Sequence, residues 1–486
     1  MNCFKNREAL ASSDQKLQEE CGVFGIAAGE ALADPAVSAY QALFALQHRG
    51  QDSSGIAVCL NGDLLAHKAK GLVPDVFDQS HLDAFHGARA AIGHVRQSGG
   101  SGTSTVSDIQ PLVVHHASGS LALCYNGKLV NSAALRAETE NRGGIFQGSN
   151  DAEVISYVIV REHLRTDTLA DAVLNAMHYL IGAYSMVVMD DRSLIAARDP
   201  NGVRPLCIGR VKDSIVFASE SCAIEALGGT FLRDVEPGEV VVTEYGSGEI
   251  QSYRCDIRAK SALCMFELIY FARQDSVVDG AAVSKVRERA GRILARDSKV
   301  EGDLVVGVPD SGIAAAMGYA RQSGIPFELG LMKNRYIQRT FIESRAWERE
   351  KSVRIKLNAN SSCVKGKRII LVDDSIVRGA TCARIVRLLR DAGAREVHVK
   401  STAPPFIYPC YFGTSLPEPG QLAAFGRTEE EVCQLIGADS LQYLRVEDLK
   451  EIASDLKIQF CDACFTGRYA VPVPRKQSDQ LRMTNF

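Results

Sequence analysis

The sequence predicts an α/β protein with two domains: a sandwich of stacked sheets covered by helices, followed by a domain with a parallel sheet. Between Cys21 and about Tyr253, short β-rich runs outnumber the helical stretches, and many are apolar on both faces, as expected for strands buried between layers. From about Ala282 the pattern changes to strand, turn and helix, which is typical of a parallel βαβ series. The divisions that we expect are a leader at residues 1–20 that is removed, domains at 21–253 and 254–470, and a tail at 471–486.

Composition narrows the class of protein. The 486 residues suffice for two or three domains, and 46% hydrophobic and 23% charged residues are ordinary for a globular chain. A net charge of -3 leaves no basic excess for a nucleic acid, and no apolar run reaches the roughly 18 residues of a membrane-spanning helix. The polar N-terminus is no secretory signal, and fourteen cysteines spread over this length indicate reduced thiols. We therefore expect a cytoplasmic protein with no nucleic-acid or membrane partner.

The elements of the first domain are short and bounded by turn residues. We expect strands at CGVFGIA, SSGIAVCL, GARAAIGHV, GSLALCYNG, YSMVVMD, SLIAARD, SIVFAS and EVVVTEYG. Helices are expected at Pro35–Gln47 and Asp151–Glu162. Strands in such excess favour stacked sheets over a doubly wound sheet.

The second domain alternates strictly. The expected order is helix VRERAGRILARDS, strand DLVVGVPDS, helix GIAAAMGYARQSG, strand KRIILVDDS, helix TCARIVRLLRDAG and strand EVHVKSTA. A parallel sheet of this kind binds its ligands at the carboxyl ends of the strands. From about Pro404 to Tyr469 the pattern is less regular.

A phosphate site is indicated where strand KRIILV ends in Asp373 and Asp374. A loop of small residues and a helix follow, and their backbone N–H groups can cradle a phosphate. Two carboxylates beside a polyanion need hydroxyls or a metal, and a ribose diol with Mg²⁺ supplies both. An acidic turn that caps a helix is the alternative. No G-x-x-x-x-G-K-[ST] motif is present, which excludes a nucleotide triphosphatase loop.

This segment, with its R-G-A-T loop, resembles the signature of type I phosphoribosyltransferases. The resemblance implies binding of 5-phosphoribosyl diphosphate by Asp373, Asp374, Ser375, Arg378, Gly379 and Thr381. A second turn, VPDSG, would present Ser311 to a diphosphate. Between the two turns, a run rich in basic residues suits a flap that closes over diphosphate, although charge runs are also common on solvated faces. Its candidate residues are Arg335, Arg339, Arg354 and Lys356.

The first domain offers a source of nitrogen. Cys21 opens the first apolar strand, and removal of the leader would make it the first residue. Its α-amine, with a pKa of about 7.7–8.0, could then be the base for its own thiol. A lone cysteine on a strand is otherwise a small buried hydrophobe.

Further polar residues end other strands of this domain. Arg96 closes GHVR with a guanidinium suited to a carboxylate. The side-chain amide of Asn126 and the backbone N–H of Gly127 could form an oxyanion hole. Asp151 could pair with the α-ammonium of an amino acid.

Five motifs make the resemblance plain: E-C-G-V-F-G, Q-H-R-G-Q-D, G-H-V-R, N-G at Asn126 and D-P-N-G-V-R-P-L. They resemble the class II, N-terminal-nucleophile glutamine amidotransferases, and from Cys21 to about Tyr469 the chain resembles the amidophosphoribosyltransferase family. The resemblance implies an N-terminal-nucleophile α/β/β/α sandwich followed by a type I phosphoribosyltransferase domain.

The implied activity is that of a glycosyltransferase (pentosyltransferase) in de novo purine synthesis, at its first committed step. Glutamine is hydrolysed, and its ammonia displaces diphosphate from C1 of 5-phosphoribosyl diphosphate to give 5-phosphoribosylamine. By motif, the nucleophile falls on Cys21, the oxyanion hole on Asn126 and Gly127, glutamine binding on Arg96 and Asp151, and Mg²⁺ with ribose on Ser311, Asp373 and Asp374. A homo-oligomer (a tetramer) and feedback by purine nucleotides are further family expectations.

Four cysteines stand in motifs of the second domain: Cys264, Cys410, Cys461 and Cys464. Their spacing alone leaves zinc and a [4Fe–4S] cluster open. The resemblance implies the cluster, because the branch of the family with a short leader and matching cysteines carries one. We expect structural thiols at Cys3, Cys59, Cys124, Cys207, Cys222, Cys255, Cys363, Cys382 and Cys433.

Some neighbours of the implied glutamine site depart from the family pattern. They are Gln97, Tyr125, Lys128, Asn150 and Ala152. One hypothesis is a weakened or retuned use of glutamine; lineage drift in a working enzyme is the alternative. Two other readings are a paralogue in a specialised pathway and a regulator that senses 5-phosphoribosyl diphosphate, the latter opposed by the absence of a basic patch and by the intact Cys21.

Overall fold

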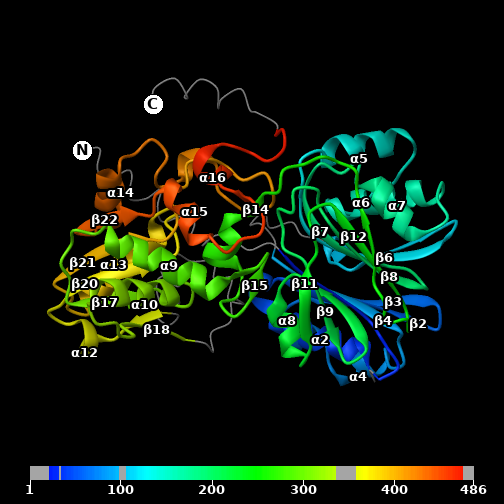
Figure 1. The fold of residues 1–486 in the computed structure, drawn as a ribbon, viewed down its shortest axis with the longest axis horizontal. Helices are drawn as coiled ribbons and strands as arrows, with labels where there is room; N and C mark the ends of the chain where they lie inside the picture. Colours follow the sequence, from blue (N-terminus) through cyan, green and yellow to red (C-terminus); the bar gives the residue numbers. More distant parts are fainter. Residues whose placement is uncertain (1–20, 32–33, 98–105, 335–356, 474–486) are drawn as a thin grey trace.

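The computed structural model describes residues 21–31, 34–97, 106–334 and 357–473. The expected leader, the four flap residues Arg335, Arg339, Arg354 and Lys356, and most of the expected tail lie outside these ranges. Figure 1 shows two lobes, a sandwich formed by the first half of the chain and a helix-covered parallel sheet formed by the second.

The first lobe contains two antiparallel sheets. In spatial order, the seven-stranded sheet consists of β11 (Thr230–Asp234), β9 (Cys207–Val211), β10 (Ser214–Ala218), β1 (Cys21–Ala27), β4 (Ala90–Arg96), β2 (Ser53–Leu60) and β3 (Asp63–Lys70). The six-stranded sheet consists of β13 (Gln251–Arg254), β12 (Glu239–Glu244), β8 (Ser193–Arg198), β7 (Gly182–Met189), β6 (Gly119–Leu129) and β5 (Leu112–His116).

Side chains alternate between the two faces of each strand, so each sheet packs on its partner sheet on one side and on helices on the other, which gives four layers. In β1, Val23 and Ala27 face the second sheet and pack in one core with Val187, whereas Phe24 and Ile26 face the opposite side. Helices cover both outer faces: α2 (Pro35–Ala45), α3 (Val73–Val76) and α8 (Ser221–Ala226) over the first sheet, and α6 (Asp151–His163) and α7 (Leu169–Ala176) over the second. The order is therefore α/β/β/α. The remaining elements of this lobe are η1 (Gln47–Arg49), α4 (Gln79–Asp83), η2 (Val106–Asp108) and α5 (Ser132–Asn141).

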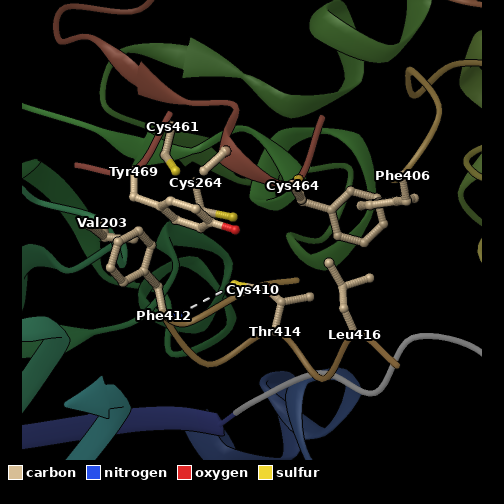
Figure 2. Close-up of a pocket in the computed structure, with 12 residues that line it drawn as sticks. Val203, Cys264, Phe406, Cys410, Phe412, Thr414, Leu416, Cys461, Cys464 and Tyr469 are labelled. Atoms are coloured by element: carbon tan, nitrogen blue, oxygen red, sulfur yellow. Dashed lines mark hydrogen bonds between the residues drawn. The ribbon is translucent and has the colours of Figure 1, made fainter. Parts of the chain in front are cut away.

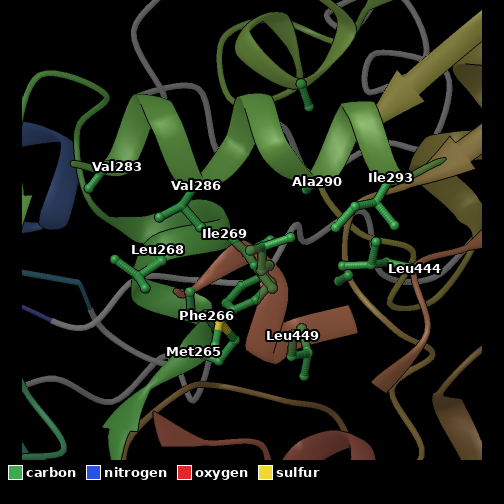
Figure 3. Close-up of a cluster of buried hydrophobic side chains, with 14 of the residues drawn as sticks. Met265, Phe266, Leu268, Ile269, Val283, Val286, Ala290, Ile293, Leu444 and Leu449 are labelled. Atoms are coloured by element: carbon green, nitrogen blue, oxygen red, sulfur yellow. The ribbon is translucent and has the colours of Figure 1, made fainter. Parts of the chain in front are cut away.

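The second lobe is built on four parallel strands, in the order β17 (Leu304–Gly307), β20 (Arg368–Asp373), β21 (Glu396–Ser401) and β22 (Ser440–Tyr443). One apolar core on this sheet includes α13 (Ala380–Asp391) and α14 (Glu429–Ile436), and the other includes α9 (Val283–Arg296) and α10 (Gly312–Ser323). On α9, Val283, Val286, Ala290 and Ile293 form one apolar stripe, which Figure 3 shows against the buried residues of the π-helical turn η3 (Glu267–Phe271).

The region from about Pro404 to Tyr469, whose sequence pattern is less regular, also contains short elements. It contains η4 (Pro419–Gln421), η5 (Val446–Asp448), α15 (Leu449–Ile452), β23 (Phe460–Cys461) and α16 (Ala463–Thr466). β23 pairs in parallel with β14 (Leu263–Cys264), so this region returns to the start of the lobe. The remaining elements are β15 (Val277–Val278), β16 (Ala281–Ala282), β18 (Leu331–Lys333), β19 (Leu357–Ala359) and α12 (Ser361–Val364).

The α/β class and the order of strands and helices are confirmed. The sequence patterns did not predict β3, β5, β9, β11 and β13. Four of these strands lie at an edge of a sheet and β9 lies second from an edge, where one-sided burial weakens the apolar signal. Among the described residues, no helix combines the length and apolar character that crossing a membrane requires.

Candidate active sites

Cys21 lies in the layer between the two sheets of the first lobe. Side chains alternate along a strand, so Cys21 lies on the same face of β1 as Val23 and Ala27, which pack between the sheets. Its register partner in β4 is Arg96, and His94 is the partner of Val23. A thiol and a guanidinium therefore share the inner face at one end of the sandwich.

Asn126 faces this layer from the other sheet. It follows Cys124, a member of the core between the sheets, at a spacing of two along β6. Asn126 is fully buried, and within the described chain neither its Oδ1 nor its Nδ2 has a hydrogen-bond partner. Buried amides are normally satisfied, so this one is available to a ligand. The ring of His94 joins the sheets, since its Nε2 lies 3.1 Å from the Tyr125 carbonyl oxygen.

Gly127 has a backbone that only glycine adopts readily. Its φ is +144°, and a Cβ there would lie 2.0 Å from the carbonyl oxygen of Ala183 on β7. The close packing of β6 on β7 therefore accounts for the glycine that directly follows the buried amide of Asn126.

Asp108 links Arg96 to the N-terminus of α6, where Asp151 follows Asn150. Arg96 Nη1 donates to the Asp108 carbonyl oxygen at 2.5 Å, and Asn150 Nδ2 donates to the same oxygen at 3.0 Å. Asp151 begins α6, and its Oδ2 accepts the Leu129 N–H at 2.9 Å. The structure therefore brings both predicted glutamine-binding residues to the same end of the sandwich as Cys21.

The departures from the family pattern have local roles. Gln97 Nε2 donates to Asp52 at 3.0 Å, and Asn150 Oδ1 accepts the Ala152 N–H, which caps α6. The Tyr125 hydroxyl donates to Asp151 at 3.3 Å. Lys128 is exposed, two residues beyond Asn126 on the same face of β6.

The phosphoribosyl site forms at the carboxyl end of the parallel sheet. β20 ends in Asp373, and both Asp373 and Asp374 are buried. Ser375 Oγ donates to Asp374 Oδ1 at 2.6 Å, and the Ser311 hydroxyl donates to Asp374 Oδ2. The two turns, after β17 and after β20, are thus joined at one carboxylate, which brings Ser311 to Asp374.

The loop after this carboxylate leads into α13. Gly379 is the residue before the helix and has φ +82°, a left-handed conformation that favours glycine. Arg378 precedes it, and Thr381 lies in the first turn of α13. These residues place backbone N–H groups and a helix N-terminus beside the aspartates, which suits a phosphate.

Four cysteines line one pocket of the second lobe. Figure 2 shows Cys264, Cys410, Cys461 and Cys464 among apolar side chains such as Phe406, Phe412 and Tyr469. Cys264 and Cys461 are register partners in β14 and β23. Burial raises the pKa of the Cys461 thiol to about 12 and that of Cys464 well above its ordinary value.

One feature that sequence reasoning missed is a buried charge network between the lobes, formed by Arg49, Arg204, Glu220 and Glu267. Arg49 and Arg204 stand in the motifs Q-H-R-G-Q-D and D-P-N-G-V-R-P-L, and Glu267 lies three residues after Cys264. The charged residues themselves were visible in the sequence, but their partners are distant along the chain.

An α/β/β/α sandwich that carries a candidate cysteine nucleophile, followed by a domain with a phosphoribosyl site, defines the class of two-domain glutamine-dependent transferases. The chain matches the glutamine amidotransferase domain over residues 97–226 and the phosphoribosyl transferase domain over residues 274–403. It is 45% identical to an amidophosphoribosyltransferase of Methanocaldococcus jannaschii, covering 93% of this chain and 98% of that protein. With one of Bacillus subtilis it shares 46% identity, over 94% of this chain and 95% of that protein. The chain belongs to the amidophosphoribosyltransferase family.

A solved structure agrees with this assignment. The B. subtilis glutamine phosphoribosylpyrophosphate amidotransferase complexed with ADP and GMP superposes with a TM-score of 0.86 at 44% identity, covering 94% of this chain and 98% of that one. The protein is accordingly a pentosyltransferase that uses glutamine and 5-phosphoribosyl diphosphate, and the reading as a mere sensor of 5-phosphoribosyl diphosphate falls away.

Proposed function

We propose that Cys21 is the nucleophile that releases ammonia from glutamine. Its position on the inner face of β1, opposite Asn126, supports this role. The thiol attacks the amide carbon, and the oxyanion that forms accepts hydrogen bonds from Asn126 and from the Gly127 N–H. The C–N bond then breaks to release ammonia, and water hydrolyses the resulting thioester to glutamate and the free thiol. Arg96 would bind the α-carboxylate of glutamine, and Asp151 its α-ammonium.

Removal of the leader is part of this proposal. A free α-amine on Cys21 can take the thiol proton and return it to the departing ammonia, whereas a peptide nitrogen cannot. Intact-mass measurement tests this step: an active protein should begin at Cys21. Full glutaminase activity in a protein that retains residues 1–20 would contradict it.

The second half-reaction occurs at Asp373 and Asp374. We place the ribose hydroxyls on these carboxylates and the phosphate on the N–H groups of the loop that includes Ser375, Arg378, Gly379 and Thr381. Ammonia attacks C1, and diphosphate leaves with the electrons of the C–O bond. The oxygen donors of Ser311, Asp373 and Asp374 fit Mg²⁺, which would neutralise charge on the diphosphate when bound.

The four cysteines are proposed to hold a [4Fe–4S] cluster. Their pocket is apolar and is lined by four cysteines, the number of thiolates that such a cluster uses. A single zinc ion fits less well. In a tetrahedral zinc site, Zn–S bonds of about 2.3 Å bring the sulfurs within about 4 Å of one another. Among the described residues, three ligand atoms that all lie within 4.8 Å of one another are found at His178, Cys255 and Asp256, and the four pocket cysteines do not form such a group.

The observation that carries the proposal is the pair of sites in one chain: an unpartnered buried amide at Asn126 in the sandwich, and Ser311 and Ser375 bonded to Asp374 at the parallel sheet. Glutamate and diphosphate release, measured with glutamine and then with ammonium, tests the coupling. We further propose feedback by purine nucleotides, supported by the ADP and GMP in the B. subtilis complex, and a homo-oligomeric, tetrameric assembly. Another relative is described as an allosteric regulatory enzyme of purine biosynthesis.

A second candidate is a paralogue with weakened glutaminase in a specialised pathway. The hydrogen bond from Tyr125 to Asp151 favours it, because it occupies part of the proposed ammonium site. Product analysis with the two nitrogen donors separates the candidates: purine synthesis requires efficient use of glutamine.

A further inference from the structure

Arg49 connects the backbone of Cys21 to the second lobe. This side chain is 2% exposed, and its Nε donates to the carbonyl oxygen of Cys21 at 2.9 Å. Its Nη1 and Nη2 make a bidentate interaction with the carboxylate of Glu267, at 3.0 and 2.8 Å. Glu267 begins η3 in the second lobe, so the group that holds the Cys21 backbone is itself held from the other domain.

The hydrogen bond from Arg49 to Cys21 lies at the end of β1 that pairs with fewer neighbouring strands. Pairing of β1 with β10 begins at Phe24, whereas pairing with β4 extends to Cys21. At Cys21 the strand is therefore paired on one side, and Arg49 adds a restraint on its carbonyl group. A nucleophile at the first residue of a strand needs such a restraint, because small displacements of reacting atoms are costly.

Glu267 also binds a second arginine. Arg204 Nη1 donates to Glu267 Oε1 at 3.1 Å, and Arg204 Nη2 donates to the Phe412 carbonyl oxygen at 2.8 Å. The Phe412 N–H lies 3.4 Å from the Cys410 sulfur. A single buried carboxylate thus joins the nucleophile strand to the loop that carries one of the pocket cysteines.

The other partner of Arg49 is anchored in the same way. Arg49 Nη1 donates to Glu220 at 2.7 Å, and Glu220 accepts hydrogen bonds from Ser276 Oγ at 2.6 Å and the Arg273 N–H at 2.8 Å. Burial works against the charge of Arg49, but Glu267 and Glu220 outweigh it and hold the pKa of the guanidinium well above its usual range. The guanidinium therefore stays charged. It is held directly by Glu267 of the second lobe and by Glu220 of the first lobe, which Arg273 and Ser276 of the second lobe bind in turn.

We propose that Glu267 is a positioning residue for the glutamine reaction, which acts through Arg49 to fix Cys21 and so makes glutamine hydrolysis depend on how the second lobe is docked. The proposal rests on Cys21 as the nucleophile. It assigns Glu267 no part in phosphoribosyl transfer.

The test compares Glu267→Gln with Asp279→Asn. Asp279 is a matched control, because it also crosses the interface as a buried, two-pronged partner of an arginine, Arg198, at 2.7 and 2.8 Å. The other contacts of Arg198 are the carbonyl oxygens of Gly202, Arg204 and Val235, and Cys21 is not among them. We expect Glu267→Gln to lower kcat with glutamine about a hundredfold and to leave kcat with ammonium within about twofold. Asp279→Asn should change kcat with glutamine and kcat with ammonium by the same factor.

A readout without turnover accompanies the kinetics. Alkylation of Cys21 by iodoacetamide should slow in Glu267→Gln and keep its rate in Asp279→Asn. Glu267→Asp keeps the charge on a shorter side chain and should show a smaller loss of the same selectivity, which keeps the test open if Glu267→Gln does not fold. Equal losses with both donors in the Glu267 variants, or the same donor selectivity in Asp279→Asn, would overturn the proposal. Glutamine use by Cys21→Ala would overturn the nucleophile assignment as well.

Discussion

The hydroxyl of Tyr125 donates a hydrogen bond to Asp151 Oδ2 at 3.3 Å. The Leu129 N–H donates to the same oxygen at 2.9 Å, so two protein donors engage the carboxylate proposed to bind the α-ammonium of glutamine. Tyr125 also packs in the core beneath α6, which fixes its ring and hence the position of its hydroxyl.

Replacing Tyr125 by Phe should release one acceptor position on Asp151. A long hydrogen bond of this kind contributes modestly, so the KM for glutamine should fall about two- to fivefold, with the ammonium reaction unchanged. Steady-state kinetics with both donors measure this. A higher KM would show that the hydroxyl orients Asp151 instead of competing for it.

Cys21→Ala should abolish the glutamine reaction and keep the ammonium reaction, because the phosphoribosyl site is built by the other lobe. Asn126→Ala should lower kcat with glutamine by about 10²–10³, the usual effect of losing one oxyanion donor. Release of glutamate, followed directly, measures both. Normal glutamate release by Asn126→Ala would remove this residue from the oxyanion hole.

Asp374→Asn should lower diphosphate release by about a hundredfold with either donor, since it removes a negative charge where a ribose and a metal are expected. Ser375→Ala is the matched control: it removes one of the two hydroxyls that orient Asp374 and should cost only a few-fold. If only the glutamine reaction suffered in Asp374→Asn, the aspartate would belong to a different step.

Removing a pocket cysteine should remove iron. Anaerobically purified protein should contain iron and acid-labile sulfide, and Cys464→Ser should lose both, because a cluster of this type uses four thiolates. Cys433→Ser is the control, since its thiol bonds to the Ala438 carbonyl oxygen away from the pocket. Stoichiometric zinc without sulfide would contradict the cluster.

Local patterns predicted a large part of the fold and indicated the candidate site residues, because such patterns report on contiguous residues. The strand KRIILV, its two aspartates and the following glycine specify a turn within one segment, and parallel pairing then brings Ser311 to Asp374 at the shared sheet edge. Alternation along β1 and β6 likewise places Cys21 and Asn126 on inner faces.

Contacts between distant segments could not be read in this way. Arg49 and Glu267 lie 218 positions apart, and nothing in either motif indicates its partner. The role of Tyr125 also depended on the start of α6, because only the packed helix places Asp151 beside its hydroxyl. Edge strands such as β5 and β13 were missed because exposure blurs their alternation.

The central claim is that one chain couples glutamine hydrolysis to phosphoribosyl transfer. It is tested most directly by supplying amide-¹⁵N glutamine together with 5-phosphoribosyl diphosphate and measuring glutamate, diphosphate and the label in the ribosylamine product. Equal amounts of glutamate and diphosphate, with ¹⁵N in the product, are the expected result. Glutamate released without matching diphosphate, or a product without label, would contradict the account.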